Sequence, residues 1–218
     1  LGEIYRQLGC YQEAKQLLEQ SCQICSGYYS EVCMAWWPTL HLGKLYIDLG
    51  DYAAAERIFL KSFTIQKKHI GTNHIRTSWA AHQLANVYTK TGRFDEAEKL
   101  FIPVLEHYQK HYGANHLECA HLFCDLGQFY LLKKDYVRSK AFIDQALCIF
   151  TKYNHHDKYR CFEVLGDFHL ARITAQARKD LSNNIEPALR NLRCALDIAK
   201  SRFPKNSAHT ARITKKIE

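Results

Sequence analysis

Cysteine and histidine residues occur in two segments whose spacing could bind a metal or exchange disulfides. CQIC occupies residues 22–25, and HLECAHLFC, at residues 116–124, contains two histidines and two cysteines. Thiolate and imidazole groups are the usual protein ligands of zinc, and a closed structural site needs four of them in tetrahedral positions. A redox pair and a zinc site are therefore the first chemistries to consider.

The surroundings of both segments favour ordinary helix residues instead. CQIC lies in a helical pattern with no flanking strand and no second CxxC. Cys119 and Cys124 are five positions apart, so they do not share one face of a helix. The sequence also contains no Ser-His-Asp set, P-loop, Gly-rich nucleotide loop or HExxH motif. We therefore predict no metal, no cofactor, no catalytic residues and no enzymatic activity.

The strongest pattern in the sequence is a repeat. LANVYTKTGRFDEAEKLF begins at Leu84, and related segments begin at Leu1, Leu42, Leu126 and Leu165. The steps between these five leucines, taken in chain order, are 41, 42, 42 and 39 residues. A period of that size indicates stacked supersecondary units.

Residue types recur at fixed distances from the first leucine of each copy. An aromatic residue or histidine four positions later lies on the same helix face, and a glycine eight positions later in three copies predicts a left-handed helix end. Small residues thirteen positions later, such as Ala97, predict close contact between two antiparallel helices. One hairpin cannot bury its apolar face alone, so the copies must stack. We expect an all-α, right-handed solenoid of stacked helix hairpins, in which Leu84, Tyr88 and Phe101 are packing residues.

These segments resemble the tetratricopeptide repeat (TPR), and more specifically the 42-residue subtype found in kinesin light chain. The links between copies carry a glycine and then a histidine before the next helix, as in Gly71–His74 and Gly113–His116. Ile75 and Leu117 stand where that subtype usually has proline after the histidine. The resemblance implies a TPR superhelix that acts as a non-catalytic scaffold and binds a partner through its concave face.

The period divides the chain into five repeats, with about ten extra residues near 171–184 in the fifth, and a partial sixth repeat. We expect the first helix of the fifth repeat to run through Ala171–Arg178, Ser182–Asn184 to form a turn, and Pro187 to lie in the first turn of the second helix, where its missing N–H does little harm. The sequence begins at the repeat position of Leu1 and stops at the equivalent position of Ile217, so we expect a segment of a longer array. The expected repeat bounds are 1–33, 34–74, 75–116, 117–155, 156–204 and 205–218.

The first helix of each TPR lines the concave face, which places the candidate binding residues. Its exposed stripe should hold the residues five, two and one before the first leucine and two after it, because these offsets differ by threes and fours. Aromatic side chains there provide apolar anchors, cations pair with carboxylates, and amides bond a peptide backbone. For Trp37 and Trp79 the alternative is packing between neighbouring repeats. The candidate peptide-binding residues are Trp37, His41, Lys44, Trp79, His82, Asn86, His121, Asp125, Gln128 and Arg160.

Composition narrows the classes of partner. The chain has 218 residues, 47% of them hydrophobic, and a net charge of +8 that favours acidic partners. It has no block of five or six Lys or Arg and no RNA-binding aromatic motif, so we predict no binding to nucleic acid. It has no apolar run long enough to span a membrane and no signal peptide at its start. Nine cysteines, an odd number, indicate a reduced, cytoplasmic protein.

Together these features predict a protein-interaction scaffold or adaptor. The expected partner is a protein or a short extended peptide that carries an acidic residue and an aromatic or large apolar residue. The alternative is that the array is the regulatory sensor arm of a larger signalling protein with a nucleotide-dependent switch. The flanking sequence would discriminate between them, since a P-loop upstream supports the sensor and heptads upstream support an adaptor.

Overall fold

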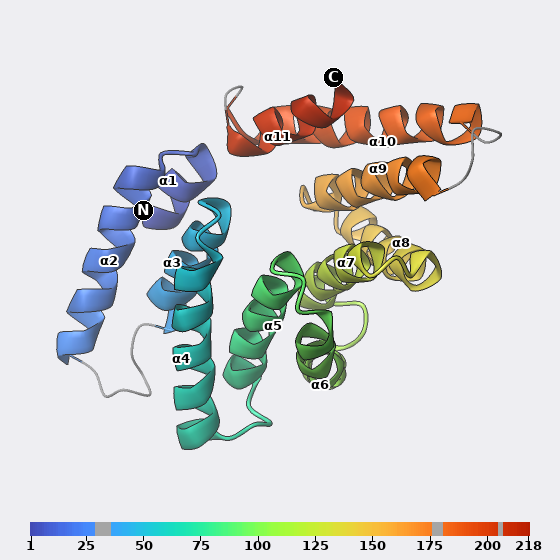
Figure 1. Cartoon of the computed structure of the whole chain (residues 1–218). Coiled ribbons are helices and arrows are strands. Elements are labelled where there is room, and N and C mark those ends of the chain that lie inside the picture. The colour runs from blue at the N-terminus through green and yellow to red at the C-terminus, as the bar shows by residue number, and fades with distance from the viewer. Residues whose placement is uncertain (29–35, 176–180, 205–206) are drawn as a thin grey trace. The chain divides into compact units, whose positions relative to one another are not determined.

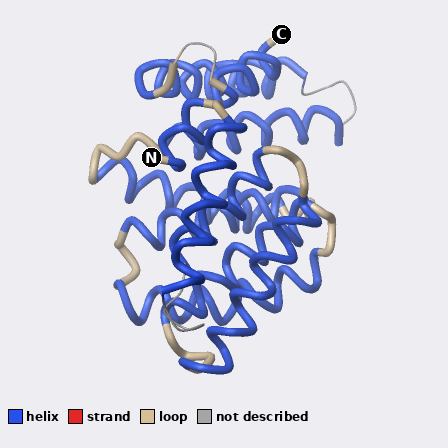
Figure 2. Tube along the Cα trace, turned by 90° about the vertical axis from the view of Figure 1, so that its left-hand side faces the viewer, coloured by secondary structure: helices blue, strands red, loops and turns tan. Residues whose placement is uncertain are grey.

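The computed structural model describes residues 1–28, 36–175, 181–204 and 207–218. These residues form α-helices joined by short links and contain no strand (Figures 1 and 2). The helices are α1 (Gly2–Leu8), α2 (Tyr11–Tyr28), α3 (Trp36–Asp48), α4 (Tyr52–Ile70), α5 (Ile75–Lys90), α6 (Phe94–Tyr112), α7 (Leu117–Leu132), α8 (Tyr136–Lys152), α9 (Lys158–Ala175), α10 (Leu181–Arg202) and α11 (Ala208–Ile217).

The helices form two compact units, Leu1–Gly113 and Ala114–Glu218. In the first unit α1 pairs with α2, α3 with α4 and α5 with α6, and each pair also contacts the next through α2 with α3 and α4 with α5. In the second unit α7 pairs with α8 and α9 with α10, while α8 contacts α9 and α11 packs on α10. Each unit is a stack of helix hairpins, which confirms the predicted all-α solenoid fold.

The residues that define the repeat are buried where the helices meet. Leu84 and Tyr88 on α5, and Ala97 and Phe101 on α6, all belong to the core, and Ala97 is fully buried. The same position thirteen residues after the first leucine is fully buried in three other repeats. Their packing role is therefore confirmed. The equivalents of Ala97 are Ala14, Ala55 and Ser139.

A second small-residue position, directly after the first leucine, is absent from the sequence pattern described above. A Cβ atom added to Gly43 would lie 2.3 Å from the ring of Phe59, and one added to Gly127 would lie 2.3 Å from Cδ1 of Ile143. Real Cβ atoms do not approach other atoms so closely. In these hairpins the two helices therefore cross at a point where one of them has no side chain, and the large residue of the other fills that space.

The turn inside each of the first four hairpins, from α1–α2 to α7–α8, contains a left-handed residue. Gly92 has φ 77° after α5, and Lys134 adopts φ 63° at the equivalent place after α7. In both turns the residue after the left-handed one donates its N–H back to the helix, from Arg93 to Tyr88 and from Asp135 to Tyr130. Glycine takes this conformation without steric cost, whereas a lysine Cβ crowds the carbonyl.

Two expectations for the fifth repeat are wrong. α10 begins at Leu181, so Ser182–Asn184 are helical rather than a turn, and Pro187 lies inside the helix rather than in its first turn. Proline has a helical φ, but inside a helix it lacks the N–H and its ring crowds the carbonyl four residues earlier. α10 packs along α9 and fully buries Ala188 and Leu192, which favours a continuous helix. α9 continues to Ala175 as expected, and residues 176–178 of the expected helix lie outside the described residues.

Ala97→Leu should destabilise the first unit. Three extra carbon atoms at a fully buried helix crossing cannot be accommodated without moving α5 and α6 apart. We expect the free energy of unfolding to fall by about 1–3 kcal/mol, as is typical of overpacked cores. Chemical denaturation measures this change, and an unfolding curve identical to that of the wild type would contradict the packing argument.

Lys134→Gly should stabilise the second unit. Glycine removes the steric cost of about 1–2 kcal/mol that a non-glycine residue has in the left-handed conformation. It also raises the conformational entropy of the unfolded chain, which offsets part of that gain. We therefore expect an increase of at most about 1 kcal/mol in the free energy of unfolding. Asn154→Gly is the control, because Asn154 has φ 46° and asparagine tolerates that region. A destabilised Lys134→Gly variant would contradict the prediction.

Candidate functional site

An aromatic group on α3 and α5 is the most accessible part of the candidate site. The Trp37 ring is 51% exposed. Its centroid lies 6.3 Å from that of Trp79 and 4.9 Å from that of His41. Trp79 is partly buried and donates its indole N–H to the Tyr112 hydroxyl at 3.2 Å. Trp79 therefore packs within its own hairpin, while Trp37 presents half of its surface to solvent.

Two of the candidate histidines are buried, so the expectation that they lie on an exposed stripe is wrong. His41 is 8% exposed, and its Nδ1 lies 2.7 Å from Oε2 of Glu3. His82 is 4% exposed and packs edge-on against Phe101 and Tyr108. In both cases the second helix or the preceding repeat covers the ring. These histidines can support neighbouring residues, but little of their surface can reach a ligand.

Lys44 and Asn86 occupy equivalent positions, two residues after the first leucine of their repeats. Each is partly exposed. Lys44 lies on α3, the helix that carries Trp37, and Asn86 lies on α5, the helix that carries Trp79. The first unit thus presents a cation, an amide and two indoles on two neighbouring first helices, and these two helices are in contact.

Beside this group, a network of charges joins α1 to α3. Arg6 donates to Glu3 at 2.7 Å and also pairs with Asp48. Burial raises the pKa of Glu3, but hydrogen bonds from Arg6 and His41 lower it more, so the pKa lies well below its ordinary value. Glu3 therefore remains a carboxylate. The network fixes His41, which in turn contacts the Trp37 ring.

In the second unit the candidate residues pair with one another. Arg160 on α9 donates to Asp125 on α7, and Nδ1 of His121 lies 3.4 Å from Oδ2 of Asp157. Burial lowers the pKa of His121 to about 4, so its imidazole is neutral at pH 7. Gln128 is partly exposed on α7. Here the polar stripe holds adjacent first helices together.

A charge cluster between α9 and α11 continues this arrangement, and the sequence interpretation missed it. Arg212 donates to both carboxylate oxygens of Glu163, at 2.9 and 2.8 Å. Lys216 donates to Glu163 at 2.8 Å and to Asp167 at 2.7 Å. The four residues occupy expected stripe positions, and opposite charges at matching positions of consecutive repeats were the available signal.

The pKa values of the two carboxylates of this cluster shift in opposite directions. Burial raises the pKa of Glu163, but Arg212 and Lys216 lower it more, so the net pKa is lowered. Burial also raises the pKa of Asp167, and Lys216 does not fully offset this effect because the Glu163 charge adds to it. Glu163 is thus the carboxylate that the cluster stabilises in its charged form.

The cysteines of the two segments considered first are not paired with each other. Cys22 and Cys25 are partly buried free thiols on α2, while Cys119 and Cys124 are buried on α7. Burial raises the pKa of Cys119 to about 11, so it carries no thiolate near neutral pH. Cys119 is therefore unlike the exposed, low-pKa cysteines of redox sites.

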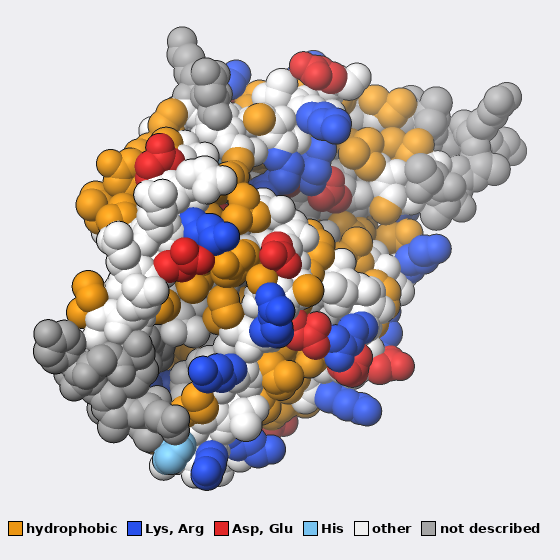
Figure 3. All heavy atoms as spheres, turned by 60° about the vertical axis from the view of Figure 1, so that its left-hand side comes forward, with side chains coloured by type: hydrophobic (Ala, Val, Ile, Leu, Met, Phe, Trp, Pro, Cys, Tyr) orange, Lys and Arg blue, Asp and Glu red, His pale blue; other side chains and the backbone are white. Residues whose placement is uncertain are grey.

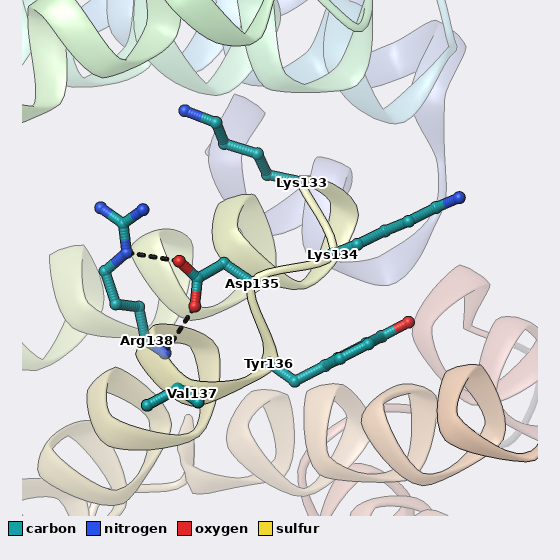
Figure 4. Close-up of a pocket in the computed structure, with 6 residues that line it drawn as sticks. All are labelled: Lys133, Lys134, Asp135, Tyr136, Val137 and Arg138. Atoms are coloured by element: carbon teal, nitrogen blue, oxygen red, sulfur yellow. Dashed lines mark hydrogen bonds and ion pairs between the residues drawn. The ribbon is translucent and has the colours of Figure 1, made fainter. Parts of the chain in front are cut away.

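A shallow hollow lies at the turn between α7 and α8 (Figure 4). Asp135 accepts the Arg138 backbone N–H at 3.0 Å and its side chain at 2.6 Å, so this carboxylate caps α8. The Arg138 guanidinium lies 4.2 Å from the Tyr130 ring centroid. The charged groups of this turn therefore serve the helix start. On the face shown in Figure 3, cationic and anionic side chains are likewise interspersed.

Comparison with known protein families shows what the sequence is similar to. Sequence models of the tetratricopeptide repeat match residues 31–101 and 76–152, and a further one matches residues 1–28. The chain belongs to the tetratricopeptide-repeat family. No curated protein matches it in sequence. The earlier resemblance to this family is confirmed, and proteins of the family are generally non-catalytic scaffolds that bind proteins or peptides.

Solved structures share the fold at low sequence identity. BtubC (BKLC) from P. vanneervenii has a TM-score of 0.65 at 17% identity, over 92% of this chain and 78% of that one. The nearly identical TPR-like repeats of a putative kinesin light chain from Podosopora anserina give 0.61 at 21% identity, over 92% and 93% of the two chains. The fold is therefore that of kinesin light chain-like TPR arrays. Among the described helices, none is long and apolar enough to cross a membrane.

Glu163→Gln should weaken the second unit in a pH-dependent way. The amide removes the charge that Arg212 and Lys216 pair with, and we expect a loss of about 1.5–3 kcal/mol at pH 7. Because the folded pKa of Glu163 is lowered, its stabilisation is complete above the ordinary value of 4.5 and is lost as the pH falls below it. The difference between variant and wild type should therefore narrow in acid.

Denaturation at neutral and acidic pH measures this difference. Asp167→Asn is the matched control, since the raised pKa of Asp167 means that its charge is not stabilised by folding. At pH 7, Asp167→Asn should lower the free energy of unfolding by less than Glu163→Gln does. A Glu163→Gln penalty that stays constant through the acid range would contradict the assignment.

Proposed function

We propose that this chain is a non-catalytic scaffold that binds a short extended peptide through the first helices of its repeats, with the main anchor on α3 and α5. The observation that carries the proposal is the Trp37 ring, half exposed beside Trp79. A large apolar ring left half in solvent next to another indole is typical of a binding surface. The Glu3–His41 contact holds the helix beneath it.

The chemistry of this surface favours a peptide with one aromatic or large apolar residue and one acidic residue. The apolar side chain would lie on Trp37 and gain from desolvation of both surfaces. The carboxylate would lie near Lys44, on the same helix, and the net charge of +8 attracts an acidic peptide at long range. Asn86 offers an amide donor and acceptor to the peptide backbone.

The energies of these contacts differ. An exposed ion pair contributes only about 0–1 kcal/mol, whereas a truncated aromatic anchor commonly costs more than 1 kcal/mol. Affinity should therefore depend mainly on the indoles, and charge should govern the choice of partner and the association rate. His41 and His82, being buried, are proposed to position the surface rather than to contact the peptide.

Substitutions on α3 and α5 should separate binding from folding. Selection from a displayed library of extended peptides that combine Asp or Glu with Trp or Phe supplies the probe, and fluorescence anisotropy measures its affinity. Trp37→Ala should weaken binding at least about tenfold, and Lys44→Glu or Asn86→Ala by a few-fold, all without lowering the melting temperature. Trp79→Ala should lower both affinity and melting temperature, because it also loses the bond to Tyr112.

Ile102→Ala is the matched control for Trp37→Ala. Ile102 is 54% exposed on α6, a second helix of the same unit, so it tests whether any exposed apolar residue would serve. Its loss should leave affinity unchanged. Binding that survives all the α3 and α5 substitutions and is lost with Ile102→Ala would place the site on the second helices and refute the proposal.

A further inference from the structure

Three side chains with metal-binding atoms gather where α9 begins. His121 comes from α7, while His155 and Asp157 lie in the link between α8 and α9. One ligand atom from each lies within 4.8 Å of the others, and all three residues are partly buried. His121 and His155 belong to the fourth repeat of the pattern and Asp157 to the fifth, and the zinc candidate considered from sequence, HLECAHLFC, contributes only His121.

The spacing of the ligand atoms is close to that around a tetrahedrally coordinated zinc ion. Zinc–nitrogen and zinc–oxygen bonds are about 2.0–2.2 Å long, so two ligand atoms in a tetrahedral site lie roughly 3.3–3.5 Å apart. Nδ1 of His121 and Oδ2 of Asp157 are already separated by 3.4 Å. The remaining pairs lie within 4.8 Å, so they need to close by about 1.5 Å at most, which side-chain rotations can supply.

The two imidazoles are held in place by a common aromatic neighbour. The His121 ring packs edge-on against Phe150 with centroids 5.1 Å apart, and the His155 ring stacks on the same Phe150 at 5.5 Å. Phe150 is fully buried on α8. Preorganised ligands lose little rotamer freedom on binding, which is the usual requirement for a metal site. The nearby cation Arg160 is paired with Asp125, which offsets its charge.

We propose that His121, His155 and Asp157 form a binding site for a divalent transition metal ion of the zinc class. Two imidazoles and one carboxylate suit zinc, cobalt and nickel better than calcium or magnesium, which prefer oxygen ligands. Three protein ligands leave a fourth position for water, as in open zinc sites. This proposal departs from the sequence-based expectation of no metal, and it does not depend on peptide binding in the first unit.

Metal binding competes with a hydrogen bond in the link before α9. Nδ1 of His155 accepts the Asp157 N–H at 3.3 Å, as His74 and His116 do for Arg76 and Glu118 at 3.1 Å in the preceding links. A neutral imidazole has one ring nitrogen with a free lone pair, so a metal ion bound to His155 displaces this hydrogen bond, the longest of the three. The equivalent cap of α11 is Ser207, which shows that serine can perform the same role.

This equivalence provides a clean experiment. His155→Ser removes the imidazole but keeps a capping oxygen, and His116→Ser makes the same change at a cap outside the cluster. Asp157→Asn removes the carboxylate charge with almost no change of shape. Calorimetric titration of the reduced, chelator-treated chain with zinc chloride gives stoichiometry and affinity, and cobalt chloride reports the ligands by its absorption spectrum. Thermal melting without metal verifies that each variant is folded.

We expect one zinc ion per wild-type chain and tetrahedral cobalt bands without thiolate charge transfer. His155→Ser and Asp157→Asn should each weaken binding by more than the roughly 10–100-fold that loss of an outer-shell partner costs, while His116→Ser should bind as the wild type does. The absence of stoichiometric zinc, thiolate bands from the cysteines, or unchanged affinity in folded His155→Ser would each overturn the proposal.

Discussion

The close crossing of the two helices in each hairpin is the constraint on which the rest of the structure depends. At Gly43, Gly127 and Gly166 a single added carbon would lie 2.3, 2.3 and 2.6 Å from the partner helix. The missing side chain lets Phe59, Ile143 or Leu192 fit against the backbone. Each hairpin thereby becomes a compact layer, and its remaining apolar surface packs on the next hairpin in its unit.

One side of each first helix packs inside its hairpin. The two units differ in the side chains on the other side of these helices. In the first unit that side carries Trp37 and Trp79, which give it an apolar surface. In the second unit it carries charges that pair with the next first helix, as in Asp125 with Arg160 and Glu163 with Arg212. The proposed peptide anchor therefore lies in the first unit, while in the second unit paired charges connect consecutive first helices.

The sequence predicted much of the fold but less of the site. Burial of Ala97 and Phe101 and the left-handed turn at Gly92 follow from periodicity, because each depends only on the helix repeat and on local backbone geometry. The site depends on neighbours. His41 and His82 occupy expected stripe positions, but Glu3 and Tyr108 reach them from other helices, and a one-dimensional pattern does not say which helix covers a given residue.

The sequence by itself determined the all-α repeat, its 42-residue period and the residues that pack one helix on another, since these are local and repeated. Tertiary structure decided that α10 is continuous through Ser182–Asn184, since α10 packs on α9 and buries Ala188 and Leu192. It also decided the meeting of His121 with His155 and Asp157. The physical reason is the same in both cases, because contacts between different helices contribute stabilising free energy that no local spacing encodes.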